Sequence, residues 1–416
     1  GKVRPAQKVR VAANQAWFEY QPARVEKSNP KVDRFDPPQV NNAVIDQYDE
    51  AGLGLEQGNL AAIQSLKIFR SLRYGKNVDL IITDNHSFRS EPVSDLAEVA
   101  QFQPETLPLF FPFDALEILD AGRAYNNNHP PETIEYDGRQ IPNPRKNAPP
   151  KSVLGTKQKA WFKERLRASS APWKLWGNSF AMLDWRLDLQ NLPADFKLRW
   201  PSKSFGTLGG DWTTYRTERN EILDYIKQEK ITSLVTVVGD RHSFFAGLLS
   251  ASLPPNNFQP VAAEFITGSV SAPGLVEAMS YRIPKDDPQR PLFFYQPSNA
   301  ADAQPSFNFS ILNGVRSSLM LQQTCDVKKA LSVRNSDVSP HLSFVDMGGH
   351  GYSRVRVTQD DLDVEFVCLP RPLERSDTPD GGPLKYRVAH RLKHWKPGES
   401  PRLERTKLEG DIPVLF

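Results

Sequence analysis

The segment ITSLVTVVGDRHSFFAG (residues 231–247) is the most informative part of the chain. Residues 231–238 are rich in β-branched side chains and do not alternate between apolar and polar, which is typical of a strand buried on both faces. Gly239 follows and allows a tight turn. Asp240 and His242 come next, and we expect residues 244–251 to form a helix.

Helix and strand patterns alternate before this segment, with short connections between them. Such an order predicts an α/β fold with a mixed sheet. After about residue 255 the pattern changes to strand-like segments separated by turn residues, which predicts a β-rich second layer of the same domain. The other predicted elements are helices at 6–20, 155–169 and 212–229 and strands at 66–75, 78–83 and 173–183.

Composition excludes several classes of protein. The chain has 416 residues, and 52 Lys and Arg against 49 Asp and Glu leave a net charge of only +3. A charge balance this even does not favour a nucleic-acid or membrane partner. No apolar run reaches the roughly 18 residues of a membrane span. Two cysteines, Cys325 and Cys368, exclude a disulfide scaffold. Pro-rich and Asn-rich punctuation at 103–150 predicts an ordered insertion.

Asp240 and His242 are the strongest candidates for a functional site. Ligands in open α/β sheets bind beyond the carboxyl ends of strands, which is where these residues lie. Two residues apart in extended backbone, their side chains point the same way, and a carboxylate and an imidazole suit iron, manganese or zinc. A simple turn followed by a capping or surface histidine would give the same pattern.

Further polar residues stand at or near predicted strands. Asn178 interrupts 173–183, where a structural hydrogen-bonding role is the simplest interpretation. His350 lies between glycines, which suits either a loop near a ligand or a plain hairpin. Asp84 and His86 follow the strand at 78–83. We expect the remaining histidines to lie on the surface; they are His129, His341, His390 and His394.

Motifs of several enzyme classes are absent from the sequence. There is no Gly-x-Ser-x-Gly elbow, P-loop, dinucleotide glycine fingerprint or His-Glu-x-x-His. Serine hydrolase, nucleoside triphosphatase and dehydrogenase functions therefore have no support.

Six blocks together carry a resemblance to one family. The sequence resembles the PhoD-like alkaline phosphatases and phosphodiesterases, a branch of the calcineurin-like metallophosphoesterases, over roughly residues 10–370. The blocks are FRSLRYGKNVDLIITDNHSFRS (69–90), LGTKQKAWFKERLRASSAPWKLWGNSF (154–180), DWTTYRTERNEILDYI (211–226), VVGDRHSFFAG (237–247), EFITGSVSAPG (264–274) and HGYSRVRVT (350–358).

This resemblance implies a metallophosphoesterase-type β-sandwich flanked by helices and metal-dependent hydrolysis of phosphate monoesters or diesters. Family members hold iron(III) with calcium, and many are exported, which implies a periplasmic or secreted protein. Asp240 and His242 match the family's last metal-ligand motif. Arg241 is a candidate to neutralise phosphate charge or, equally, points away from its two neighbours. Asn178 and His350 complete the candidate catalytic residues.

The chain also departs from the family pattern. The family's earlier metal motifs, which supply most of the ligands, are absent, and His86 stands where the family block has Arg. We therefore expect this chain to be the C-terminal part of a longer precursor. It would form a domain at 1–370 that lacks its first strands and a basic, Pro-rich surface extension at 371–416. A second chain would supply the remaining ligands.

Two functions from different classes follow. The first is a phosphoester hydrolase that uses a metal-activated hydroxide. The alternative is a catalytically silent binding or structural subunit on the same scaffold.

Overall fold

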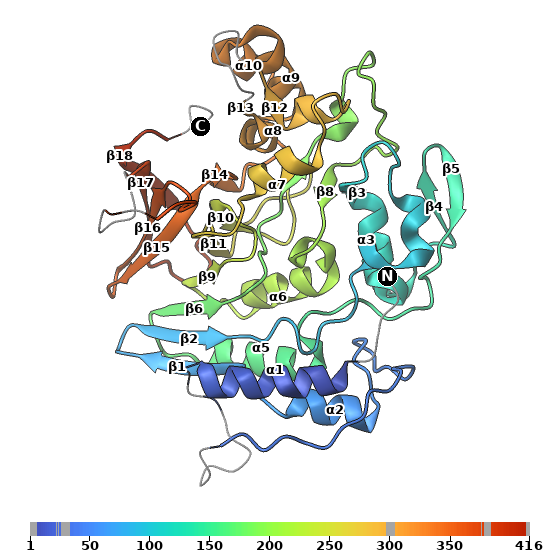
Figure 1. The fold of residues 1–416 in the computed structure, drawn as a ribbon, viewed down its shortest axis with the longest axis vertical. Coiled ribbons are helices and arrows are strands. Elements are labelled where there is room, and N and C mark those ends of the chain that lie inside the picture. Colours follow the sequence, from blue (N-terminus) through green and yellow to red (C-terminus); the bar gives the residue numbers. More distant parts are fainter. Residues whose placement is uncertain are drawn as a thin grey trace.

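A seven-stranded mixed sheet forms the centre of the molecule (Figure 1). The computed structural model describes residues 6–21, 23, 25, 34–296, 304–375, 377 and 384–412. The strand order is β1-β2-β6-β9-β11-β10-β14. The strands are β1 (Arg70–Tyr74), β2 (Val78–Ile82), β6 (Trp173–Gly177), β9 (Leu234–Val238), β10 (Phe244–Leu249), β11 (Ala262–Ile266) and β14 (Leu342–Asp346).

The direction of the strands determines what meets at each edge. Strands β2, β6, β9 and β11 are parallel neighbours, whereas β10 is antiparallel to both β11 and β14. Consequently β14 runs in the same direction as the four parallel strands. The carboxyl ends of five strands therefore lie at one edge of the sheet.

A second sheet covers one face of the first. Strands β15 (His350–Val357), β16 (Asp361–Leu369), β17 (Tyr386–Lys393) and β18 (Leu403–Gly410) form an antiparallel meander. Phe366 of β16 stacks on Phe244 of β10 with 4.9 Å between ring centroids, and both belong to one buried apolar cluster. This sheet-on-sheet packing forms the predicted sandwich.

Helices cover the other face. The long helices α5 (Gly155–Ala168) and α6 (Arg216–Gln228) confirm two predicted helices, and α6 begins four residues later than expected. Phe162 of α5 packs on Trp176 of β6 at 4.3 Å between centroids, and Ile222 of α6 joins the same cluster. The N-terminal α1 (Gln7–Tyr20) lies beside α2 (Gln57–Gln64) in Figure 1.

The segment 103–150 is an ordered unit with apolar packing of its own. Helix α3 (Phe113–Ala121) packs with the hairpin of β4 (Thr133–Tyr136) and β5 (Arg139–Pro142). A short sheet of β3 (Phe110–Pro112), β8 (Gly206–Leu208) and β7 (Arg186–Leu187) connects it to the centre of the chain.

The remaining elements are short. They are α4 (Tyr125–Asn128), α7 (Leu275–Arg282), α8 (Phe307–Asn313), α9 (Val315–Thr324), α10 (Val327–Ser332), β12 (Phe294–Tyr295), β13 (Gln304–Pro305), and the 3-10 helices η1 (Val93–Asp95), η2 (Ala97–Phe102), η3 (Gly122–Ala124), η4 (Leu189–Asn191), η5 (Trp212–Thr214) and η6 (Arg290–Leu292).

Three details differ from the expectations. Residues 244–251 were expected to form a helix but contain strand β10, because β11 and β14 bond to it on both sides; a short apolar run does not distinguish a buried strand from a helix. The strand predicted at 173–183 ends at Gly177. Within the expected surface extension from residue 371, β17 and β18 continue the second sheet, and alternate residues of β17 are buried.

Two of the four histidines expected on the surface are buried. His341 is 2% exposed and His390 is 0% exposed, whereas His129 and His394 are exposed as expected. His390 lies on the inner face of β17, with its ring 4.8 Å from the Phe366 centroid. The alternation of Tyr386, Val388, His390 and Leu392 accounts for its burial.

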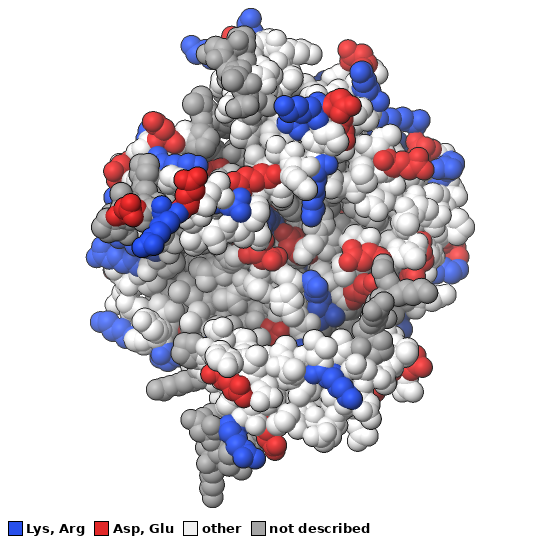
Figure 2. Space-filling model, viewed as in Figure 1, with Lys and Arg blue, Asp and Glu red and all other residues white. Residues whose placement is uncertain are grey.

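The surface shows no large area of one charge on the face drawn in Figure 2, where Lys and Arg are interspersed with Asp and Glu. In the part of the chain that the structure describes, the helices are too short or too polar to cross a membrane.

Burial of His390 gives a prediction about acid stability. Burial lowers the pKa of His390 to about 3, below the roughly 6.5 of an unfolded histidine. The contribution of neutral His390 to the free energy of unfolding is therefore fully present above about pH 6.5 and is lost as the pH falls. We expect wild type to lose about 2 kcal/mol more unfolding free energy than His390→Phe between pH 8 and pH 5, measured by urea unfolding. The exposed His129→Phe should keep the wild-type pH dependence; an equal slope in His390→Phe would contradict the assignment.

Candidate functional site

Polar residues gather at the edge where five strands end. Asn178 follows β6, Asp240 and His242 follow β9, and His350 opens β15 four residues after the end of β14. The backbone N–H of Asn178 donates to the Val237 carbonyl at 3.2 Å, which ties the first two positions together. The fold thus brings the residues predicted from three separate blocks to one edge of the sheet.

The turn 239–243 has an unusual backbone. Its left-handed residues are Asp240 (φ +60°) and His242 (φ +52°), rather than Gly239, to which the sequence assigned the tight turn. Asp240 is exposed, although partial burial and then the negative charge of Asp211 raise the pKa of its carboxyl. His86 is close enough to oppose that rise, so the end of β2 also faces this turn.

The ring of His242 is held by one hydrogen bond. Its Nδ1 lies 2.7 Å from the carbonyl oxygen of Pro273. Because a carbonyl only accepts, Nδ1 carries the proton, and Nε2 of the neutral ring has a free lone pair. This is the tautomer that binds a metal or accepts a proton through Nε2.

Gly274 lies next to both His242 and His350. A methyl group placed at Gly274 would lie 3.4 Å from His350 Nε2 and 3.6 Å from the His242 carbonyl oxygen, which is ordinary van der Waals contact with both loops. His350 is only 2% exposed, and its Nδ1 lies 3.2 Å from the Ser269 carbonyl oxygen. Its Nε2 is 3.5 Å from Glu277. The ring therefore packs behind the loop, where it supports the site instead of facing solvent.

Asn178 is also a buried residue, at 3% exposure. Its Oδ1 accepts hydrogen bonds from Asn85 and from the Trp212 indole, the latter at 3.3 Å. Its Nδ2 has no partner in the described part of the chain. These contacts link the end of β2 to the start of η5 and fit the structural role expected from sequence.

Arg241 points away from Asp240 and His242. Its guanidinium is buried and bonds to the Asp211 carboxylate, with 2.6 Å from Nη2 to Oδ2. This direction corresponds to the second of the two alternatives drawn from sequence. It argues against a direct contact between Arg241 and phosphate.

Sequence reasoning missed Arg89, an accessible cation near this edge. Its guanidinium lies 4.8 Å from the Phe180 ring centroid, and His86 meets the same ring at 5.0 Å. Among the described residues Arg89 forms no ion pair or hydrogen bond. Its only sequence signal is its position seven residues after β2, at the edge where the other polar residues gather.

Two buried carboxylates hold the segment 182–186 behind the site. Glu264 in the middle of β11 accepts from the backbone N–H groups of Met182 and Leu183 at 2.8 and 2.7 Å, and from the Thr236 hydroxyl at 2.8 Å. Burial raises the pKa of the Glu264 carboxyl, which these three hydrogen bonds oppose.

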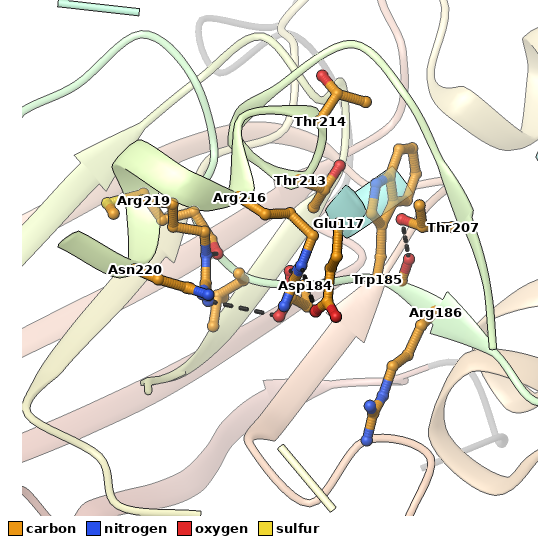
Figure 3. Close-up of polar contacts among 12 residues, drawn as sticks. Glu117, Asp184, Trp185, Arg186, Thr207, Thr213, Thr214, Arg216, Arg219 and Asn220 are labelled. Carbon is orange, nitrogen blue, oxygen red and sulfur yellow. Dashed lines mark hydrogen bonds and ion pairs between the residues drawn. The ribbon is translucent and has the colours of Figure 1, made fainter. Parts of the chain in front are cut away.

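The second carboxylate belongs to Asp184, and Figure 3 shows it among arginines from α6. Arg216 Nη1 lies 2.9 Å and Arg219 Nη2 lies 3.5 Å from its oxygens, and Arg216 also pairs with Glu117 of α3. Burial alone would raise the pKa of Asp184, but the two arginines bring it below its ordinary value. Arg186 points away from this cluster in Figure 3.

Removing the Asp184 carboxylate should destabilise the fold strongly, because buried Arg219 would lose its counter-charge and buried Arg216 would keep only Glu117. We expect Asp184→Ala to lower the free energy of unfolding by about 3–5 kcal/mol, measured by chemical denaturation. The exposed Asp286→Ala should change it by less than about 0.5 kcal/mol. Equal stability of the two variants would show that the cluster contributes little.

The donors at this edge do not complete a metal centre on their own. Asp240 and His242 supply a carboxylate and an imidazole nitrogen, both suitable ligands. However, the described residues contain no group of three or more His, Cys, Asp or Glu that could hold a metal ion. Since a catalytic metal ordinarily has at least three protein ligands, Asp240 and His242 do not suffice to hold one.

Two packed sheets flanked by helices, with polar loops at the carboxyl edge, define an α/β sandwich of the kind that binds ligands at that edge. A family model described as PhoD-like phosphatase matches residues 1–366, so the chain belongs to the PhoD-like phosphatase family. This confirms the family and the fold class expected from sequence.

Individual relatives are distant. Alkaline phosphatase D of Bacillus subtilis (strain 168) is 22% identical over 144 residues, which are 33% of this chain and 22% of that protein. The solved structure of PhoD matches with a TM-score of 0.52 and 16% sequence identity, over 97% of this chain and 50% of that chain. The chain thus spans about half the length of that structure, and the likeness supports the fold alone.

Proposed function

We propose that this chain forms part of a phosphoester hydrolase whose reaction takes place at the carboxyl edge of the central sheet. The observation that carries the proposal is the convergence of Asp240, His242 and Arg89 at that edge in a chain of the PhoD-like phosphatase family. Monoesters and diesters both fit this chemistry.

Phosphoryl transfer depends mainly on positioning and on stabilising negative charge. Arg89 supplies a guanidinium without a carboxylate partner in the described chain, which suits the oxygens of a phosphate group. Phe180 supports this cation from one side. The hydrogen bond from His242 Nδ1 to the Pro273 carbonyl leaves Nε2 as the ring nitrogen that would bind a metal ion.

Iron(III) and calcium remain part of the proposal, with Asp240 and His242 as this chain's ligands. The other ligands are proposed to come from a preceding segment or a second chain of the same precursor. Intact-mass analysis tests the second chain, and a single metal-replete 46.9 kDa species would exclude it. A periplasmic or secreted location belongs to the same proposal and is tested by cell fractionation.

Removing the His242 imidazole should abolish turnover while the fold remains. We expect His242→Ala to lower the hydrolysis of an aryl phosphate monoester or a bis-aryl phosphate diester by about 100-fold or more. Circular dichroism should be unchanged, because among the described residues the ring bonds only to the Pro273 carbonyl. Wild-type turnover in this variant would remove His242 from the site.

Arg89 should act mainly on phosphate binding. We expect Arg89→Gln to raise KM by about 10- to 100-fold, since a charge-assisted hydrogen bond is worth roughly 1.5–3 kcal/mol. Arg402→Gln is the matched control, because it removes the same charge from an exposed residue next to β18, away from the candidate site. Equal KM values for the two variants would show that Arg89 does not contact the substrate.

The catalytically silent subunit is the second candidate. The absence of a three-donor group among the described residues favours it. Metal analysis beside hydrolysis of an aryl phosphate separates the two functions. Stoichiometric iron with chelator-sensitive turnover supports the hydrolase, and neither metal nor turnover supports the silent subunit.

A further inference from the structure

The turn that carries Asp240 and His242 has an unfavourable backbone that something else must stabilise. Left-handed φ values are uncommon for residues with a side chain, and this turn has two of them separated by one residue. Such conformations persist only where surrounding contacts offset their energetic cost. Arg241, the residue between them, makes the contacts that could do so.

We propose that Arg241 is a positioning residue, whose buried guanidinium holds the 239–243 turn so that Asp240 and His242 face the edge of the sheet. This inference rests on the proposed function. The side chain of Arg241 is 2% exposed and lies against the rings of Trp185 and Phe245, 4.7 and 4.8 Å from their centroids.

Both acceptors of the Arg241 guanidinium are themselves fixed. Asp211 accepts from Arg241 Nη2 at 2.6 Å and Nε at 3.2 Å through Oδ2, while its Oδ1 accepts from the Thr213 backbone N–H at 2.9 Å and caps η5. The Leu183 carbonyl accepts from Nη2 at 2.7 Å, and the Leu183 N–H is bound to Glu264. The guanidinium therefore links the turn to the Asp211 carboxylate and the Leu183 carbonyl, both of which belong to residues held by further hydrogen bonds.

The geometry requires arginine and not merely a positive charge. Nε and Nη2 bind one carboxylate oxygen while Nη2 also reaches a carbonyl, and a planar guanidinium has donors in this fixed arrangement. A lysine ammonium could replace only part of this set. The side chains of Asp240 and His242 then point outward because Arg241, between them, points inward.

Arg186 provides a matched control for the loss of a buried arginine. It also lies on an aromatic ring, 4.0 Å from the Phe205 centroid, and bonds to backbone carbonyls, including Val338 at 2.8 Å. Its contacts to Pro254 and Asp337 belong to loops that follow β10 and precede β14, at the opposite edge of the sheet.

The kinetic test compares Arg241→Lys, Asp211→Asn and their double variant with Arg186→Lys. We expect Arg241→Lys and Asp211→Asn each to lower kcat per folded molecule by 10- to 100-fold, with KM changed less than 3-fold. The kcat of the double variant should be no lower than that of the less active single variant, because both changes break the same bridge. Arg186→Lys should lower Tm to a similar extent and leave kcat within 2-fold. An equal loss of kcat in Arg186→Lys, or unchanged kcat in Arg241→Lys, would overturn the proposal.

A second readout does not depend on activity. Long-range proton–nitrogen NMR of the His242 ring at fixed pH should show the Nδ1-protonated tautomer in wild type and in Arg186→Lys. In Arg241→Lys the same signals should shift or average as the ring leaves the Pro273 carbonyl. If wild type hydrolyses no phosphoester, the proposed function fails, and this spectrum alone decides the positioning role. An unchanged His242 spectrum in Arg241→Lys would refute it.

Discussion

The fold around the site depends on carboxylates buried without access to water. Glu264 lies in the middle of a strand whose neighbours bury both faces, and it binds the backbone of the 182–186 segment. Asp184 binds the same segment to α6 through Arg216 and Arg219. A buried charge is tolerated only with such partners. The segment behind the candidate site therefore has one arrangement in which every charge is compensated.

The 182–186 segment connects these buried carboxylates to the 239–243 turn at the edge of the sheet. The 182–186 segment offers the Leu183 carbonyl to Arg241, and Arg241 sets the direction of its two neighbours. His242 is held from the other side by Pro273, next to the glycine that also touches His350. Residues in the interior thus contribute to which side chains lie at the candidate site.

Local patterns predicted much of this structure. The apolar run before Gly239 and the position of Asp240 and His242 at a strand end follow from sequence alone, because parallel strands end at one edge. The helix expected at 244–251 was wrong, since periodicity does not distinguish buried strands from helices. The left-handed φ values of Asp240 and His242, which accompany the inward direction of Arg241, are specified by no residue pattern. The burial of His390 could have been predicted from the alternation of apolar residues in β17. The burial of His341 could not, because it depends on a contact with the Asp184 carbonyl, 157 positions away in sequence.

The order of the two sheets along the chain has a consequence for synthesis. The aromatic face of the central sheet, with Phe244 and Phe265, is formed well before the strands that cover it. During translation that face has no partner until β16 and β17 leave the ribosome, more than 100 residues later. A nascent chain paused in this interval presents an apolar strand surface of the kind that chaperones bind and that aggregates otherwise.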